Sequence, residues 1–224
     1  RRRVPGIGRH ALLKTPRQDN PGGANSFIYC TAFLVTAQHA VTARHCVDIG
    51  LEGRMAELAL GYLAGAPEDR VSRHRVSLGK QSEALDLAVL RIDPPASETA
   101  ALILAGSDAP AFAEIMVLQH FAAEPLSISN DAECLALEAR FDGPRTWDAE
   151  KQEEVRVTDA LFAHGCDTTS TSSGSPVLNR STYQLVGVHQ QGFFEGEAPQ
   201  NRALRVSLLR EFLGDAGVLP APGQ

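Results

Sequence analysis

"TSTSSGSPVL", residues 169–178, places five hydroxyl side chains in a row before Gly174, Ser175 and Pro176. Runs of Ser, Thr and Gly are typical of turns and flexible linkers. Here the run is followed at once by Val177 and Leu178, which read as the start of a buried strand. A serine becomes a strong nucleophile only when a neighbouring base takes its proton. The stretch therefore raises the question of whether the chain also supplies a histidine and a carboxylate.

Two other segments supply such groups in strand-like surroundings. His45 stands in VTARHCV (41–47), at the end of one β-like run, and Asp86 stands in LDLAVLRI (85–92), directly before another. A buried Asp that accepts a hydrogen bond from one ring nitrogen sets the tautomer of a histidine and supports its imidazolium form. Taken singly, each residue also has an ordinary explanation, as a core histidine, a strand-entry cap or a turn serine.

Most of the chain is expected to form short strands. Segments rich in Val, Ile, Thr and aromatic residues recur at close intervals, with turn residues between them. They cover residues 27–37, 39–47, 85–92, 114–121, 133–141, 154–162, 184–192 and 203–209. Because no long helical pattern separates them, they predict an all-β barrel or sandwich. The final segment SLLREFLGDAG (207–217) carries the apolar stripe of a short helix, with Ser207 as the expected N-cap.

The composition bounds the class of protein. The chain has 224 residues, of which 43% are hydrophobic and 21% charged, as in ordinary globular proteins. The net charge of -6 argues against nucleic acid as a partner, and no apolar run is long enough for a membrane span. A Pro-bearing stretch from Asp93 to Pro110 divides the chain. We therefore expect one β unit in residues 1–100 and a second in 101–224.

The four cysteines favour disulfides over a metal site. An even number allows two disulfides with three possible pairings among Cys30, Cys46, Cys134 and Cys166. The C-x-x-C spacing of zinc sites is missing. Disulfides indicate an oxidising compartment, so we expect a secreted or periplasmic protein that binds no metal. The competing hypothesis is a metal cluster of Cys30, His39, His45 and Cys46.

Together, these motifs resemble those of trypsin-like (chymotrypsin-fold) serine proteases. TARHC (42–46) is similar to the TAAHC of that family, DLAVLRI (86–92) to its D-[IL]-A-L-L segment, and SSGSPVL (172–178) to G-[DNS]-S-G-[GS]-P-[LV]. The three motifs also follow the family's chain order of His, Asp and Ser. The resemblance covers nearly the whole chain, from about Gly6 to the terminal helix. It implies two antiparallel Greek-key β-barrels with a short C-terminal helix, and chemistry that needs no cofactor.

The resemblance also implies a role for each site residue. Ser173, which precedes the Gly-Ser-Pro turn, takes the place of the nucleophile, His45 that of its base and Asp86 that of the orienting carboxylate. The oxyanion hole would consist of the backbone N–H groups of Thr171 and Ser173. Thr171 is the main departure, since the family usually has Gly there and the turn needs a backbone that a β-branched residue adopts poorly. The implied disulfides are Cys30–Cys46 and Cys134–Cys166.

Further details are similar to the bacterial glutamyl-endopeptidase (V8-like) branch. DTTSTSSGSPV (167–177) follows its D-T-x-x-G-x-S-G-S-P, and QHFAAEPLSIS (119–129) resembles its Q-H-P-x-G-x-P. The substrate pocket of that branch presents a Thr and a His that match Thr168 and His189, and the resemblance extends the pocket lining to Gln190 and Gly192. Asp167 would repel an acidic side chain if it pointed inward.

The implied function is a serine endopeptidase that cleaves polypeptides through an acyl-enzyme, as a monomer, with a preference for Glu before the cleaved bond. Two alternatives stay open. The first alternative is a weak or inactive binding module on the same fold, because Thr171 replaces the usual Gly of the oxyanion hole. The second alternative is that His189 lines the pocket without giving it a preference for acidic substrate residues. The remaining histidines, predicted to lie on the surface or in loops, are His10, His74, His120 and His164.

Overall fold

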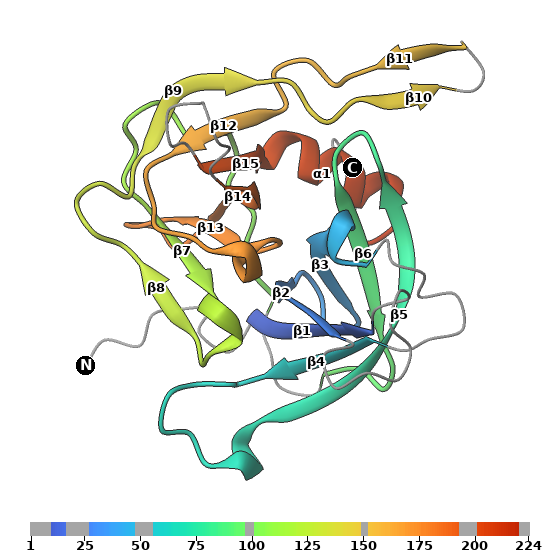
Figure 1. The fold of residues 1–224 in the computed structure, drawn as a ribbon, viewed down its shortest axis with the longest axis vertical. Helices are drawn as coiled ribbons and strands as arrows, with labels where there is room; N and C mark the ends of the chain where they lie inside the picture. Colours follow the sequence, from blue (N-terminus) through green and yellow to red (C-terminus); the bar gives the residue numbers. More distant parts are fainter. Residues whose placement is uncertain are drawn as a thin grey trace.

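The computed structural model describes residues 10–16, 27–47, 56–96, 101–148, 152–192 and 201–219. Strands dominate these residues, as predicted, and all but two of them form two groups that occupy the lower right and the upper left of Figure 1. Four short 3-10 helices connect them within the described chain: η1 (Arg44–Cys46), η2 (Glu68–Arg70), η3 (Phe121–Ala123) and η4 (Ser170–Ser172).

The first group is a closed six-stranded barrel in the order β1-β2-β3-β6-β5-β4. Its strands are β1 (His10–Pro16), β2 (Phe27–Leu34), β3 (His39–Ala43), β4 (Ala56–Leu60), β5 (Ser72–Ser82) and β6 (Leu87–Ile92). Successive side chains of a strand point to opposite faces. In β2, Ala32 and Leu34 therefore pack inside the barrel, whereas Phe33 packs into a cluster shared with the second group. The pairing of β3 with β6 and of β4 with β1 is the Greek-key arrangement.

The second group is a seven-stranded antiparallel sheet in the order β8-β7-β13-β14-β15-β12-β9. Its strands are β7 (Ile115–Gln119), β8 (Ser127–Ser129), β9 (Ala136–Phe141), β12 (Leu161–His164), β13 (Pro176–Asn179), β14 (Leu185–Gln191) and β15 (Asn201–Arg205). A bridge between Glu114 and Leu135 links the start of β7 to the chain entering β9, which curls the sheet toward closure. The all-β prediction is confirmed.

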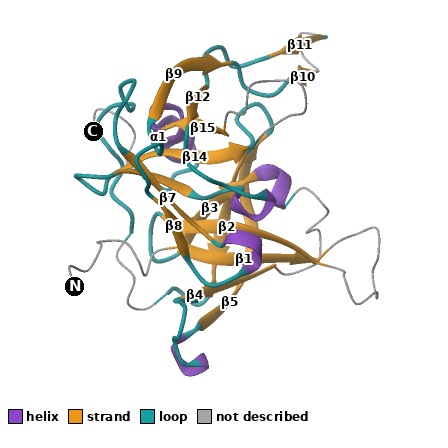
Figure 2. Cartoon of the chain, turned by 60° about the vertical axis from the view of Figure 1, so that its left-hand side comes forward, coloured by secondary structure: helices purple, strands orange, loops and turns teal. Residues whose placement is uncertain are grey.

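Some predicted strand boundaries were wrong. The expected strand 154–162 is two strands, because β11 (Glu153–Val155) pairs with β10 (Thr146–Asp148) in a separate hairpin that projects at the top of Figure 2. No segment was predicted for β1, β4 or β5. Most positions of β5 are at least partly exposed and many are polar, so the strand has little hydrophobic pattern to detect.

The two groups share an apolar cluster at their boundary. The first barrel contributes Phe33, Val41, Leu87 and Val89, and the second sheet contributes Leu118, Leu161 and Leu178. The helix α1 (Val206–Asp215) packs on this cluster through Leu209, Phe212 and Leu213. Burial of these side chains holds the rims of the two groups against each other, which fixes the boundary where the candidate site lies.

The C-terminal helix is confirmed, but Ser207 is not its N-cap. The helix begins at Val206 with Arg205 as the N-cap residue, and Ser207 lies in the first turn. The N–H and the hydroxyl of Ser207 each donate to the carboxylate of Asp108 over 2.9 Å, and Arg205 pairs with the same carboxylate at 3.1 Å. A negative charge at a helix N-terminus is favourable. The expected linker region 93–110 therefore includes a residue that stabilises the helix start.

Both cysteine pairs implied by the resemblance lie at disulfide distance, with sulfur atoms 1.98 Å apart in Cys30–Cys46 and 2.04 Å apart in Cys134–Cys166. The first pair joins β2 to η1, and the second joins the chains before β9 and after β12. A disulfide sulfur is not the thiolate that metals require. The alternative metal cluster around Cys30 and Cys46 is therefore wrong.

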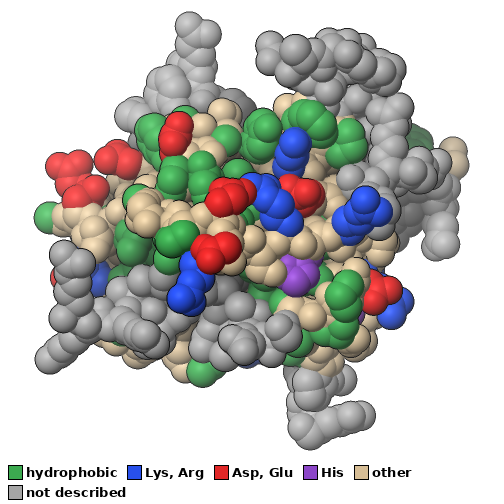
Figure 3. Space-filling view, turned by 90° about the horizontal axis from the view of Figure 1, so that it is seen from below, with side chains coloured by type: hydrophobic (Ala, Val, Ile, Leu, Met, Phe, Trp, Pro, Cys, Tyr) green, Lys and Arg blue, Asp and Glu red, His purple; other side chains and the backbone are tan. Residues whose placement is uncertain are grey.

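The surface carries both signs of charge. On the face seen in Figure 3, Lys and Arg side chains lie next to Asp and Glu side chains rather than in a separate patch. Arg73, for example, pairs with Glu57 at 3.0 Å and with Glu68 at 2.8 Å. Among the described residues, no helix has the length and apolarity to cross a bilayer.

Candidate active site

His45 and Asp86 meet at the rim of the first barrel. The carboxylate of Asp86 accepts two hydrogen bonds from His45, one from the backbone N–H at 2.9 Å and one from ring Nδ1 at 2.7 Å. An ionised carboxylate only accepts, so Nδ1 carries the proton and Nε2 of the neutral ring is left as the basic nitrogen. The His45 side chain is 48% exposed and that of Asp86 only 14%, which leaves the ring open to a substrate. The two residues are thus arranged as a base and its orienting carboxylate.

Asp86 sits on a turn with unusual backbone geometry. Its φ is 46°, in the left-handed region that few residues other than Gly adopt without strain. The N–H of Asp86 donates to the carbonyl of Glu83 at 3.1 Å, and its own carbonyl accepts the N–H of Arg44 at 3.0 Å. This backbone bond ties the turn directly to the segment that carries His45.

Ser173 follows η4, and the turn after it is docked on the first barrel. Gly174 has a φ of 82°, and a Cβ there would lie 2.2 Å from the carbonyl oxygen of Thr31, so only Gly fits. The carbonyl of Ser173 accepts the N–H of Thr31 at 2.9 Å and lies 3.9 Å from Sγ of Cys46, the residue after His45. These contacts bring Ser173 to the segment that holds His45 and Asp86.

Thr171 lies inside η4 and has no left-handed φ. In a 3-10 helix, each carbonyl points toward the N–H three residues ahead, and each N–H points back toward the helix start. In η4 the N–H of Ser172 donates to the carbonyl of Thr169 at 3.0 Å. From this geometry we expect the N–H of Thr171 to point back toward the start of the turn, away from the position that an oxyanion would take.

Contacts from β2 and from the end of β7 hold η4 in place. The Thr171 hydroxyl donates to the carbonyl of His120 at 2.8 Å, and the Thr171 carbonyl accepts the hydroxyl of Thr31 at 3.2 Å. The hydroxyl of Ser172 donates to Oε1 of Gln119 at 2.5 Å. These contacts hold the side chain and the carbonyl of Thr171 in place.

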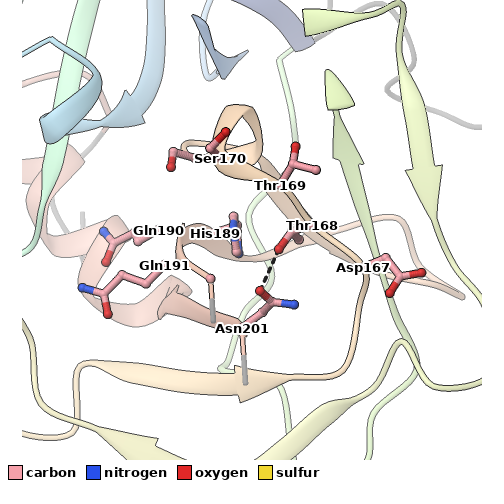
Figure 4. A pocket seen from close by; sticks show the side chains of 10 residues that line it. Asp167, Thr168, Thr169, Ser170, His189, Gln190, Gln191 and Asn201 are labelled. Carbon is pink, nitrogen blue, oxygen red and sulfur yellow. Dashed lines mark hydrogen bonds between the residues drawn. The ribbon is translucent and has the colours of Figure 1, made fainter. Parts of the chain in front are cut away.

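A cavity of about 540 Å³ lies beside Ser173 and brings together the four predicted pocket residues (Figure 4). A Cβ on Gly192 would lie 3.4 Å from Oδ1 of Asn201 and 4.0 Å from Oγ1 of Thr168, so a side chain there would project into the cavity. The lining consists of Asp167, Thr168, Thr169, Ser170, Ser173, His189, Gln190, Gln191, Gly192 and Asn201.

Asn201 lines the pocket although it lies outside the two segments around Thr168 and His189 from which the lining was predicted. The hydroxyl of Thr168 donates to Oδ1 of Asn201 at 2.7 Å (Figure 4). Nδ2 of Asn201 donates to the carbonyl of Cys166 at 2.6 Å. No motif marks Asn201. It reaches the pocket because β15 pairs with β12 in a register that sets Asn201 opposite His164. Thr168 therefore has to turn its hydroxyl away from Asn201 before it donates to a ligand.

Asp167 does not point into the pocket. Its side chain is exposed and is directed away from His189 in Figure 4. Its backbone is held on both sides, since its N–H donates to Oγ of Ser129 and its carbonyl accepts the Gln119 side-chain amide, each at 2.9 Å. The repulsion of an acidic ligand that an inward-pointing Asp167 would cause is thus largely removed.

The prediction of a surface or loop position was wrong for His164, which is buried at the end of β12, whereas His120 lies between β7 and η3 but is also buried. His120 is fully buried and its pKa is lowered to about 4, mainly by burial. His164 is 1% exposed, and its Nε2 lies 3.0 Å from Nδ1 of His189 on the pocket floor. The signal was weak in both cases, since neither histidine lies in a clearly alternating strand. The His10 side chain lies outside the described residues.

Burial keeps His164 and His189, whose rings meet edge to face, neutral. It lowers the pKa of His189 to about 3, with a smaller contribution from His45, and lowers the pKa of His164 well below its usual value. No described group lies within hydrogen-bond distance of Nδ1 of His164. A buried unpaired N–H is avoided if His164 carries its proton on Nε2 and donates to Nδ1 of His189. His189 then carries its own proton on Nε2 and lines the pocket as a neutral donor.

Known proteins share this architecture. Residues 30–188 match the family model of the trypsin-like peptidase domain. No curated protein matches the chain. The Rv3671c protease of M. tuberculosis in its active form superposes with a TM-score of 0.75 at 16% identity, over 97% of this chain and 85% of that one. The serine endoprotease of Yersinia pestis gives 0.68 at 10% identity, over 95% and 64%. The MamO protease domain of Magnetospirillum magneticum gives 0.65 at 15% identity, over 92% and 95%.

Proposed function

Since the chain belongs to the trypsin-like peptidase family, we propose that it is a serine endopeptidase that works through Ser173, His45 and Asp86. The observation that carries the proposal is the 2.7 Å hydrogen bond between Nδ1 of His45 and Asp86, next to the turn that presents Ser173. Ser173 lines a cavity of substrate size, and its carbonyl accepts the N–H of Thr31 from the first barrel, which supports a position near the His45–Asp86 pair.

The proposed cycle needs only these side chains and water. Oγ of Ser173 attacks the peptide carbonyl while Nε2 of His45 takes the serine proton, and the imidazolium then gives that proton to the leaving amine. Asp86 keeps the ring in the tautomer with Nδ1 protonated and supports the imidazolium charge. Water, deprotonated by His45, hydrolyses the resulting acyl-enzyme. Two disulfides favour an oxidising compartment, so we propose that the protein acts outside the cell or in the periplasm.

Hydrolysis of an unfolded protein substrate tests this function. Wild-type protein is expected to generate new N-termini, and Ser173→Ala is expected to generate none above background. The matched control is Ser181→Ala, because Ser181 lies in an exposed turn at the far end of β13. Equal cleavage by Ser173→Ala and wild type would show that another group, or a contaminant, does the chemistry.

We further propose, as in the V8-like branch, a preference for Glu before the cleaved bond. The pocket residue best placed to recognise a carboxylate is His189, and no Lys or Arg lines the cavity among the described residues. A Glu carboxylate would bring the counter-charge that the buried ring lacks. It would raise the pKa of His189 from about 3 and favour proton uptake on binding. The other titratable neighbours are His164 beneath His189 and His45 at the rim.

The ratio of kcat/KM for a Glu peptide to that for its Gln analogue measures this preference. A charge-assisted hydrogen bond contributes about 1.5–3 kcal/mol, so we expect a ratio of roughly 10- to 100-fold. The ratio should rise as pH falls from 8 to 6, because protonated His189 binds the carboxylate more strongly. Protonation of His45 slows both peptides equally and cancels. In His189→Gln the ratio should approach one. A wild-type ratio near one, or cleavage only after Lys, Arg or apolar residues, rules out the preference.

The conformation of η4 favours a second candidate function, a weak or inactive binding module on the same fold. Thr171 lies in a 3-10 turn, where its N–H is expected to point toward the start of the turn and away from the proposed oxyanion position. An enzyme that lacks one oxyanion donor loses roughly 10²–10³ in kcat. On this alternative, peptides bind in the cavity but are not cleaved, and substitution of Thr171 distinguishes the two functions, as described in the Discussion.

A further inference from the structure

Gln190 links the second sheet to the turn that carries Asp86. It lies near the end of β14, is 2% exposed, and its side-chain Nε2 donates to the carbonyl of Leu85 at 2.5 Å and to that of Asp86 at 3.1 Å. Both acceptors belong to the first barrel. One buried amide thus makes two hydrogen bonds across the boundary between the two strand groups, directly behind the carboxylate that holds His45.

The Asp86 turn needs such support. A non-glycine residue with left-handed φ stores strain on the order of 1–3 kcal/mol, and it persists only where its surroundings over-determine the backbone. The N–H groups of Arg44 and His45 hold Asp86 from η1. Both contacts come from the segment that carries His45, so they do not fix the position of the turn relative to the second sheet. Gln190 fixes that position, because it belongs to the sheet that carries Ser173.

We propose that Gln190 is a positioning residue, which holds the Leu85–Asp86 turn in its left-handed conformation and so sets the carboxylate of Asp86 against Nδ1 of His45. This inference rests on the proposed peptidase function. It differs from the substrate-binding role expected from the sequence, because the amide of Gln190 is directed at the Asp86 turn although the residue also lines the cavity. Gln190 would thereby make the base and carboxylate depend on correct packing of the two strand groups.

The substitution Gln190→Met tests the proposal, since it keeps the length of the side chain and removes both donors. Without them the turn relaxes and the carboxylate moves off the ring. A misplacement of about 1 Å costs up to about 10²-fold, so we expect kcat to fall roughly 10- to 100-fold. This is less than the ~10⁴-fold typical when the carboxylate of a triad is replaced by an amide. KM for a peptide with an unchanged residue before the cleaved bond should change by less than about threefold.

Two further readouts separate positioning from general damage. Loss of carboxylate support disfavours the imidazolium, so the acid limb of the kcat/KM profile should move to lower pH. The other charged or titratable groups on the elements packed here are Arg44 of η1, Glu83 of the turn and His189 of β14. The downfield proton NMR resonance of Nδ1–H in the 2.7 Å bond should shift or broaden in Gln190→Met and vanish in Asp86→Ala. Gln184→Met, in the turn before β14, is the matched control and should resemble wild type.

The outcomes distinguish this inference from the proposed function. If wild type turns over substrate and a folded Gln190→Met keeps wild-type kcat, acid limb and resonance, Gln190 is not a positioning residue. If wild type has no activity but the resonance is present and changes in Gln190→Met, the peptidase function fails while the positioning role stands. Gln190→Leu, which is uncharged and also loses the amide donor, serves as the second variant if the Met protein does not fold, and the same results are expected from it.

Discussion

Replacing either Ser173 or His45 with alanine is expected to lower kcat by about 10⁵- to 10⁶-fold, and the double variant should lose little more. The losses do not add because the serine attacks only when the histidine takes its proton, so removal of either residue abolishes the same step. Steady-state kinetics on one peptide substrate measures the three variants. The matched control is His74→Ala on β5, whose ring contacts Ser72 far from the cavity.

Two results would contradict the assignment of His45. One is a His45→Ala protein that keeps most of its activity while another histidine variant loses it. The other is a rate that stays flat down to pH 4, because kcat/KM must fall on the acid side once an imidazole base is protonated. Asp86→Asn should fall between the extremes, since it leaves the residue in place but favours the wrong tautomer of His45.

Replacing Thr171 with glycine is expected to raise kcat by about 10²- to 10³-fold, the value of one oxyanion-hole donor. Glycine adopts left-handed φ readily, so the Ser170–Thr171 peptide can rotate and its N–H can join that of Ser173. Thr171→Gly also removes the hydroxyl that anchors η4 to His120. The rate of acylation by an activated ester, measured in the pre-steady state, reports the effect most directly.

Thr171→Ala is the matched control for that gain. It removes the same hydroxyl but keeps a Cβ, so it leaves the preference for the helical backbone in place and should raise the rate far less than the glycine variant. Equal rates for wild type, Thr171→Ala and Thr171→Gly would mean that substrate binding alone reorganises η4. No acylation by any of the three would favour the non-catalytic module.

The strand-rich fold and the His45–Asp86 pair followed from sequence because each depends on local patterns. Asp86 directly precedes the apolar strand β6 and His45 follows the apolar strand β3 in η1, so the ends of these two apolar runs place both at a barrel rim. The contact between them still needed the pairing of β3 with β6, which sets Ala43 opposite Leu87. The resemblance to known proteases supplied that pairing, since periodicity alone says nothing about which strands are neighbours.

Features that depend on long-range register were not predicted. Asn201 enters the pocket through the pairing of β15 with β12, and Gln190 reaches the Asp86 turn only because β14 packs against the first barrel. The burial of His164 beneath His189 has the same origin. Thr171, by contrast, could be assessed from the sequence alone, because a β-branched residue adopts a left-handed turn poorly. The structure places Thr171 in a 3-10 turn without left-handed φ.

Covalent labelling with a fluorophosphonate, followed by peptide mapping, tests the central claim most directly. The reagent modifies a serine only where a base activates its hydroxyl, and it does not depend on knowledge of the natural substrate. The expected result is a single modified residue, Ser173, with labelling lost in Ser173→Ala and His45→Ala and accelerated in Thr171→Gly. Well-folded wild-type and Thr171→Gly proteins that both remain unlabelled, or a label on any serine other than Ser173, would contradict the assignment of the nucleophile.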